Sequence, residues 1–288
     1  MLNVLTIDVE EYFHPTELAG TADLSRWSVF PSRIEAQVQD ILELLDSRKT
    51  TATFFILGWV AEHHPKVVRE IAAGGHEIAC HSHLHRLIYD LSPSQFREDT
   101  QHAVMAIEDA CGVSPRSYRA PSFSITTRSM WALEILAENG FTHDSSIYPI
   151  VHDRYGIPGF RRHAQMLQTA SGPIYEVPVA TARISSYTIA PIGGGAYLRL
   201  LPYRYTAAGI RRLNDSEQQP ACIYFHPWEF DLRQPRLGSG RLSKLRTYTG
   251  IAGMKKKVEK LLSEFCFSSL ASVYHSADTP ACVQRAGA

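Results

Sequence analysis

The segment GHEIACHSHLH, residues 75–85, predicts a short buried strand, Glu77–Cys80, that ends in a cluster of histidines. Apolar runs at Val4–Ile7, Thr53–Leu57 and Cys222–Phe225 predict further strands of the same kind, each followed by polar residues. Four histidines within ten residues, directly after a strand, indicate a site where side chains meet and not a random surface. The fold therefore has to bring several strand ends together.

Helical patterns separate the strands, at Ile34–Leu45, Pro65–Ala73, Pro93–Ala110 and Thr127–Asn139. The alternation of strand and helix predicts a parallel sheet covered by helices. A barrel and an open doubly wound sheet both suit 288 residues. No glycine-rich phosphate-binding motif follows any strand, which argues against a nucleotide fold. The polar residues after successive strands favour a barrel, because a barrel gathers its chemistry at the carboxyl ends of its strands.

The composition excludes several classes of function. With 29 basic and 29 acidic side chains the formal net charge is zero, so nucleic acid and anionic membranes are not expected partners. The N-terminus, MLNVLTIDVEEYF, shows no secretory signal, and no run reaches the roughly 18 apolar residues of a transmembrane segment. We therefore expect a cytoplasmic protein. Its five widely spaced cysteines are expected to be reduced, namely Cys80, Cys111, Cys222, Cys266 and Cys282.

Two motifs offer metal ligands. His81 and His85 have the i, i+4 spacing that puts two imidazoles on one face of a helical turn. Asp8 and Glu10 lie two apart at a strand end and point to the same face of an extended backbone. Two histidines and one carboxylate make a hydrolytic metal site with open positions, although the same ligands serve non-haem Fe(II) oxygenases. Surface acids or a helix cap are the alternative interpretation of the acid pair.

Three later segments carry further polar residues at strand ends. Arg119, in SYRAP, can form a bidentate pair that orients a carboxylate, although a lone arginine is more often in a surface ion pair. Asp144 lies in THDSS, and His226 ends the apolar strand of YFHPWEF. A hydrogen-bonded core histidine is the alternative for His226. Trp228, two residues on, suits stacking on a sugar face.

Taken in order, these five segments resemble the NodB-homology polysaccharide deacetylase family over about residues 1–230. The closer likeness is to the exosortase-associated (PEP-CTERM locus) polysaccharide deacetylases, visible in DVEEYF, GHEIACHSHLH, YRAPSFSIT and YFHPWEFD. The resemblance implies an α/β fold, a distorted (β/α) barrel of about seven strands over residues 1–230. It also implies a small subfamily-specific C-terminal extension over residues 231–288.

The resemblance assigns the metal and the base. Glu10, His81 and His85 would bind one divalent metal ion, with Zn²⁺ favoured by the softness of the ligands and other divalent ions as alternatives. Asp8 would be the general base. Glu11 is the rival ligand, ranked below Glu10 because it faces the other way on a strand.

The remaining roles also follow from the resemblance. Arg119 would orient Asp8, and Asp144 would tune His226, the general acid. The oxyanion and substrate contacts are assigned to Ser122, through its backbone N–H, and to Tyr12 and Trp228. A serine at position 122 departs from the family, where an aromatic residue often follows the proline.

The expected function is metal-dependent hydrolysis of N-acetyl groups on a polysaccharide or its oligosaccharide precursor, with release of acetate. Alternatives on the same scaffold are hydrolysis of a cyclic ureide or imide and sugar deformylation; a saccharide-binding module is the non-enzymatic alternative. The basic run QPRLGSGRLSKLRTYTG, residues 234–250, is expected to be a solvated surface, with binding of anions or lipid head groups as the alternative. The glycine run Gly193–Gly195 suits either a substrate loop or a tight turn.

Overall fold

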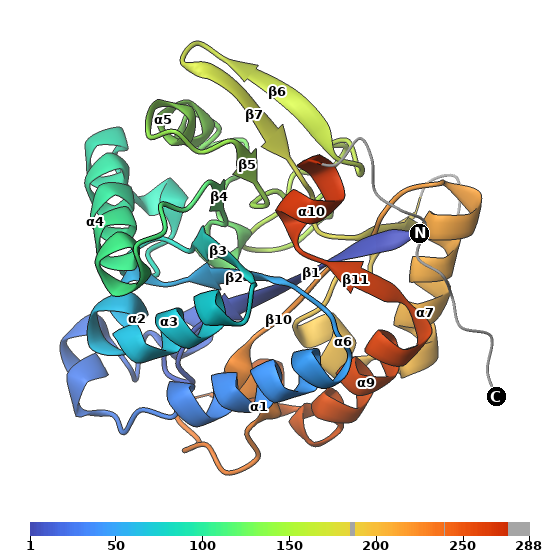
Figure 1. Ribbon diagram of the computed structural model, residues 1–288, viewed down its shortest axis with the longest axis horizontal. Coiled ribbons are helices and arrows are strands. Elements are labelled where there is room, and N and C mark those ends of the chain that lie inside the picture. The colour runs from blue at the N-terminus through green and yellow to red at the C-terminus, as the bar shows by residue number, and fades with distance from the viewer. Residues whose placement is uncertain (185–187, 239, 276–288) are drawn as a thin grey trace.

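A computed structural model describes residues 1–184, 188–238 and 240–275 (Figure 1). Its central sheet has nine strands in the order β10-β1-β2-β3-β4-β5-β7-β6, with β11 paired to β1. From β10 to β7 every neighbouring pair is parallel, and β6 is antiparallel to β7. The strands are β1 (Leu2–Val9), β2 (Thr53–Ile56), β3 (Glu77–Cys80), β4 (Ser117–Tyr118), β5 (His143–Asp144), β6 (Gln165–Thr169), β7 (Gly172–Glu176), β10 (Cys222–Phe225) and β11 (Cys266–Ser268).

The row of parallel strands curls toward closure. Beyond β7, the Ala180 N–H donates to the carbonyl of Cys222 at 3.0 Å, and the Tyr224 N–H donates to the carbonyl of Gly193 at 2.7 Å. Backbone hydrogen bonds thus link the β7 end of the row to β10. Between these contacts, β8 (Thr181–Arg183) and β9 (Ile189–Pro191) form a small antiparallel ribbon. The predicted α/β fold with a mostly parallel sheet is confirmed.

One layer of apolar side chains fills the inside of the curled sheet. Val4, Phe55, Ala79 and Cys222 come from β1, β2, β3 and β10, and they are buried together with Val177, which follows β7. Because side chains alternate along a strand, the even-numbered residues of β1 point to this interior. Thr6 and Asp8 therefore stand above Val4, toward the carboxyl end of the barrel.

Helices cover the outside of the sheet, and Figure 1 shows α1 and α9 along one side with α2, α3 and α4 on the next. Their long apolar faces form the main core, in which Leu5, Ile7 and Val9 of β1 are buried. The longest described helix, α4, starts with a capping box between Ser92 and Gln95 and ends at the left-handed Gly112, in agreement with the helical pattern at Pro93–Ala110. The helices are α1 (Ile34–Ser47), α2 (Gly58–His63), α3 (Pro65–Ala73), α4 (Pro93–Cys111), α5 (Ala132–Glu138), α6 (Ala196–Leu200), α7 (Tyr203–Arg211), α8 (Arg241–Tyr248), α9 (Ile251–Glu264) and α10 (Leu270–His275).

The segment after residue 230 takes part in the same sheet. Val4 pairs with Cys222 of β10 and also with Ser268 of β11, so β11 lies on the edge of β1 opposite β10. The division of the chain at residue 230 stays a prediction. The expectation of reduced cysteines is wrong for Cys266, which is disulfide-bonded, while Cys80, Cys111 and Cys222 are free thiols; Cys282 lies outside the described residues. Among the described helices, none combines the length and apolarity needed to cross a membrane.

Candidate active site

Glu10, His81 and His85 converge just beyond the ends of β1 and β3. The Nε2 atoms of His81 and His85 lie 3.0 and 2.9 Å from Oε1 of Glu10, and all three side chains are buried. Their potential ligand atoms lie within 4.8 Å of one another. The expected helical turn is wrong, since Ser82 and His85 have left-handed φ values of 62° and 53° and the segment is irregular. This turn brings the two imidazoles to one carboxylate without a helix.

The donor set fits a divalent cation. Nδ1 of His81 lies 2.8 Å from the carbonyl oxygen of Arg119, which can only accept, so this nitrogen carries the proton. In the neutral ring Nε2 then presents a lone pair to the carboxylate oxygen of Glu10. Two lone pairs that face each other at 3.0 Å call for a cation between them or a proton on the ring. A carbonyl partner on the second ring nitrogen is also the usual arrangement of a metal-ligating histidine.

Glu11 has a separate structural position. Its carboxylate accepts hydrogen bonds from the backbone N–H groups of Arg33 and Ile34, at 3.0 and 3.2 Å, and from the Ser32 hydroxyl. These groups start α1, so Glu11 caps that helix from a distance in sequence. Burial raises the pKa of Glu11 despite these hydrogen bonds. The structure thus brings Glu10, and not Glu11, to the histidines.

Asp8 lies beside this cluster and is bound by Arg119, which is completely buried. Nη1 of Arg119 donates to Oδ1 of Asp8 at 2.8 Å and to Oγ1 of Thr6 at 2.7 Å. Its other nitrogens donate to the hydroxyl and carbonyl of Ser145, and the guanidinium lies 4.3 Å from the ring centroid of Phe55. Arg119 therefore stands inside the barrel, between the apolar layer and the site, and contacts Asp8, the carboxylate that it is predicted to orient.

His226 follows β10 and faces Asp8 on one side and Glu229 on the other. Its Nε2 lies 3.9 Å from Oδ2 of Asp8, and its Nδ1 lies 3.2 Å from Oε2 of Glu229. Glu229 is fully buried and forms an ion pair with Arg199, whose guanidinium also donates to the carbonyls of Thr249 and Arg246. Burial alone would lower the pKa of His226, but the carboxylates of Glu10, Glu229 and Asp8 outweigh it and raise the pKa to about 9.

The predicted contact between Asp144 and His226 is corrected by the structure. The carboxylate of Asp144 accepts from the hydroxyl and the N–H of Ser146 and lies beside Glu176, with which it shares a fully buried site. Burial and the neighbouring Asp144 raise the pKa of Glu176 well above its usual range. The acid that contacts His226 is instead Glu229, three residues further along, in the short 3-10 turn Pro227–Phe230. In the sequence this contact is indicated by the spacing His-Pro-Trp-Glu, which places an acid three residues after His226.

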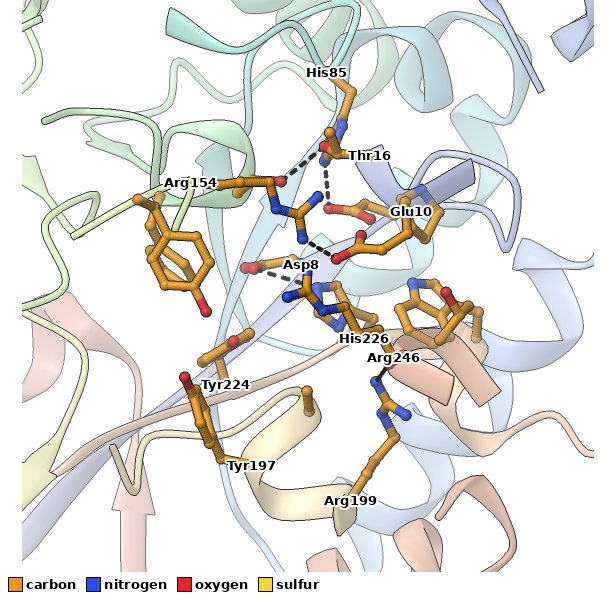
Figure 2. Close-up of a pocket in the computed structure, with 18 of the residues that line it drawn as sticks. Asp8, Glu10, Thr16, His85, Arg154, Tyr197, Arg199, Tyr224, His226 and Arg246 are labelled. Carbon is orange, nitrogen blue, oxygen red and sulfur yellow. Dashed lines mark hydrogen bonds and ion pairs between the residues drawn. The ribbon is translucent and has the colours of Figure 1, made fainter. Parts of the chain in front are cut away.

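A cavity of about 250 Å³ lies beside these residues, and its lining includes Asp8, Glu10, His85 and His226 (Figure 2). Ser122 and Trp228 line it, Ser122 in a left-handed turn with φ 51° and Trp228 stacked on His226 with ring centroids 5.0 Å apart; their oxyanion and substrate roles stay predictions. The substrate role of Tyr12 is not supported, because its side chain is fully buried against Phe13 and does not line the cavity. Lining residues that the sequence did not single out for the site include Glu17, Phe123, His152, Arg154, Tyr155, Leu200, Tyr224, Arg246 and Thr247.

The glycine run Gly193–Gly195 packs against β10. Gly194 forms a bridge with Tyr224 at φ 135°, and a Cβ there would lie 1.8 Å from the Tyr224 carbonyl oxygen. The run is therefore a close backbone contact. It starts α6, which brings Tyr197 and Arg199 to the cavity.

Residues 27–143 match the family described as polysaccharide deacetylase. This match covers less than half of the chain, and over these residues the chain is similar to that family. The match supports the NodB-homology resemblance, and it contains His81, His85 and Arg119 of the site. Residues 145–275 match a second family, described as a domain of unknown function (DUF3473), which contains His226 and Glu229.

Curated relatives of the chain match only in part. The chitooligosaccharide deacetylase of Bradyrhizobium sp. (strain ANU 289) is 28% identical over 136 residues, which are 46% of this chain and 59% of the relative. The peptidoglycan-N-acetylglucosamine deacetylase of Bacillus cereus is 30% identical over 95 residues, 33% of this chain and 34% of the relative. The chain therefore spans less than two thirds of these relatives.

Among solved structures, a Mycobacterium smegmatis protein assigned to the polysaccharide deacetylases superposes with a TM-score of 0.62 at 19% identity. The superposition covers 94% of this chain and 89% of the other. The superposition shows that the two regions of the chain matched by the family models take part in one fold that both proteins share.

Proposed function

We propose that the chain is a divalent-metal-dependent deacetylase that hydrolyses the N-acetyl group of a saccharide and releases acetate. The observation that carries the proposal is the meeting of Asp8, Glu10 and His226 at one cavity, together with His81 and His85. A base, an acid and a cation-binding triad are the groups that hydrolysis of an amide requires. The curated relatives act on chitooligosaccharide and on peptidoglycan N-acetylglucosamine, which supports this substrate class.

The triad of Glu10, His81 and His85 would hold the cation, with Zn²⁺ as our preferred ion because imidazole nitrogen suits it. When bound, such an ion supplies Lewis-acid chemistry, polarising the acetyl carbonyl and lowering the pKa of a water molecule. Three protein ligands leave coordination positions open for water and substrate.

Asp8 and His226 divide the proton transfers between them. Asp8, oriented by Arg119 through Oδ1, has Oδ2 free to accept the proton of the attacking water. His226, whose pKa in the metal-free protein is raised to about 9 by the carboxylates of Glu10, Glu229 and Asp8, can give a proton to the leaving amine. Glu229 contacts Nδ1 of the His226 imidazole, and Arg199 forms an ion pair with Glu229. In the proposal, the backbone N–H of Ser122 stabilises the oxyanion, as the resemblance implies.

The substrate is an N-acetylated hexosamine within a polysaccharide or its oligosaccharide precursor. A cavity of about 250 Å³ is at the small end of ligand sites, which fits one sugar ring and not a long stretch of chain. Trp228, Tyr197 and Tyr155 give this cavity aromatic walls for the apolar faces of sugar rings. As part of the same proposal, the chain acts in exopolysaccharide biosynthesis alongside the exosortase-associated deacetylases; the second family match, over residues 145–275, supports that likeness.

The test is release of acetate from N-acetylglucosamine oligomers by metal-loaded protein, compared with protein treated with a chelator. Asp8→Asn and His226→Ala should each lower kcat by roughly 10²–10⁴-fold, the usual contribution of a general base or acid. Asp40→Asn is the matched control, because Asp40 is exposed on α1 and lies 3.9 Å from Lys255. Binding of the oligomers without release of acetate would contradict the proposal and leave a saccharide-binding module. Turnover of a cyclic ureide in place of the oligomers would contradict it as well.

A further inference from the structure

A cluster of cations lies beside the cavity, in the segment Asp231–Gly250. The chain as a whole is neutral, but this stretch of twenty residues carries five basic side chains against the single carboxylate of Asp231. Asp231 is already engaged with Arg33 and Gln37 of the α1 region. The five basic residues are Arg233, Arg236, Arg241, Lys244 and Arg246.

Helix α8 carries these cations to the mouth of the cavity. Arg246 and Thr247 line the cavity, whereas Arg241, Lys244 and Tyr248 line a neighbouring hollow on the surface, with Arg236. The hydroxyl of Ser243 donates to the carbonyl of Glu17 at 2.8 Å, which ties α8 to another lining segment of the mouth. Helix α8 therefore forms the ridge between the catalytic cavity and this hollow. Figure 2 shows Arg246, the α8 residue that reaches the cavity, at the same cavity as Arg154 and His226.

The positive charge on the ridge is only partly balanced. Arg246 lies 3.3 Å from Asp153, whose side chain is 59% exposed, and Arg154 pairs with Glu17. For Arg236, Arg241 and Lys244, the described part of the chain provides no carboxylate within 4.0 Å. The guanidinium of Arg236 instead lies 5.7 Å from the ring centroid of Tyr248. Three uncompensated cations beside a saccharide cavity form a ready site for negative groups on the neighbouring part of the same ligand.

We propose that the substrate is an acidic glycan, whose N-acetylated sugar enters the cavity while anionic groups on flanking sugars bind Arg241, Lys244 and Arg246 along α8. This inference rests on the proposed deacetylase function and names its substrate class. Arginine and lysine bind carboxylate and phosphate groups on a sugar, and Tyr248 offers a face for the ring itself. The cavity accommodates about one sugar, so the flanking sugars of a chain have to leave across its mouth.

An anionic membrane surface fits α8 less well than a glycan. A helix that lies in a membrane interface presents a broad apolar face below its cations. Among the described side chains of α8, Leu245 is the exposed large apolar residue, at 54%, and it stands between Lys244 and Arg246. The described side chains of α8 therefore offer one exposed apolar residue between cations and no broad apolar face, and Arg246 and Thr247 join the helix to the cavity lining.

The experiment compares two oligosaccharides of equal length with the full, metal-loaded chain. Hyaluronan oligosaccharides, which alternate glucuronate with N-acetylglucosamine, are the acidic probe, and chitooligosaccharides are the neutral probe. We expect the acidic probe to bind about tenfold more tightly in calorimetry at low salt, since each exposed ion pair contributes a factor of about 1.5–5. That preference should disappear in high salt, because such pairs are screened.

The charge-reversal variant R241E/K244E should remove the preference for the acidic probe. The matched control is K255E/K256E on α9, which makes the same change in net charge on a helix whose Lys255 faces Asp40 of α1; it should keep the preference. Thermal unfolding of both variants checks that these exposed changes leave the fold intact.

Equal affinity of the wild-type chain for the two probes would overturn the inference, and so would an unchanged preference in R241E/K244E. Binding of the full chain to phosphatidylglycerol vesicles in place of the acidic glycan would overturn it as well. Acetate release is measured separately on both probes. Preferred binding of the acidic probe without acetate would refute the proposed function but leave the anion site standing. Acetate release without any preference would do the reverse.

Discussion

Replacing Glu229 by Gln tests how the fold sets the proton affinity of His226. The substitution keeps the shape of the side chain and removes its charge. Oε2 of Glu229 lies 3.2 Å from Nδ1 of His226, and a hydrogen bond to a charged group contributes roughly 1.5–3 kcal/mol. One pKa unit corresponds to about 1.4 kcal/mol. The pKa of His226, raised to about 9 in the native protein, should therefore fall by about 1–2 units in Glu229→Gln.

The sign of the effect on activity follows from the proposed role of His226 as an acid. The protonated form is active, so activity persists below the pKa of His226 and is lost as the pH rises through it. In Glu229→Gln the alkaline limb of the pH profile of kcat should move down by about 1–2 units, while activity near pH 6 stays close to that of the wild type. A purely structural role of Glu229 would lower kcat evenly at all pH values.

The assay that does not depend on turnover is an NMR titration of His226 in the metal-free protein, with His226→Ala to assign the signal. Asp144→Asn is the informative comparison, because the family resemblance gives Asp144 this role and the structure gives it to Glu229. We expect Asp144→Asn to leave the titration of His226 unchanged. A shift in Asp144→Asn together with none in Glu229→Gln would refute the reasoning.

Other substitutions separate neighbouring carboxylates by their contacts. Glu10→Gln should abolish metal binding in a metal-content assay, whereas Glu11→Gln should keep the metal and lose about 1 kcal/mol of stability in urea, as for a lost helix cap. Arg119→Met should cost about 3–5 kcal/mol in urea because it leaves the carboxylate of Asp8 buried and unpaired. Folding favours the protonated form of Glu176, because its pKa is raised in the folded protein. The stability gained from this protonated carboxyl is therefore complete below the pKa of the unfolded chain and is lost as the pH rises toward the pKa of the folded protein. The melting temperature of the wild type should fall over that window relative to Glu176→Gln, and parallel melting curves for the two proteins would contradict this.

The sequence was sufficient for those parts of the site that follow strands directly. Glu10 and His81 are the residues immediately after β1 and β3, and parallel strands bring their carboxyl ends to one edge, so meeting was predictable from order alone. The choice of Glu10 over Glu11 was also predictable, because neighbouring residues on an extended chain face opposite ways. Arg119 follows the same rule from β4.

The parts that escaped prediction depend on side-chain contacts within turns and on distant packing. Asp144 ends β5 as expected, yet its neighbours Ser146 and Glu176 satisfy its carboxylate before it can reach His226. The partner that does reach His226 comes from a 3-10 turn, which a strand-and-helix pattern does not reveal. Tyr12 follows the acid pair in sequence but turns into the core. The free energy gained by burying its aromatic ring outweighs the cost of its hydroxyl, which has no partner among the described residues.

The pairing of β11 with β1 has a consequence for how the chain folds. Strand β1, which leads into Asp8 and Glu10, lies far from β11 in the sequence, and the edge of Leu2–Val4 opposite β10 is paired only once Cys266–Ser268 is present. Contacts that span nearly the whole chain form late, because the intervening loop must close first. A nascent chain that stops before β11 leaves this part of β1 as an open strand edge, prone to pair with other chains. Pairing with β11 therefore protects the strand that leads into the candidate site from such contacts.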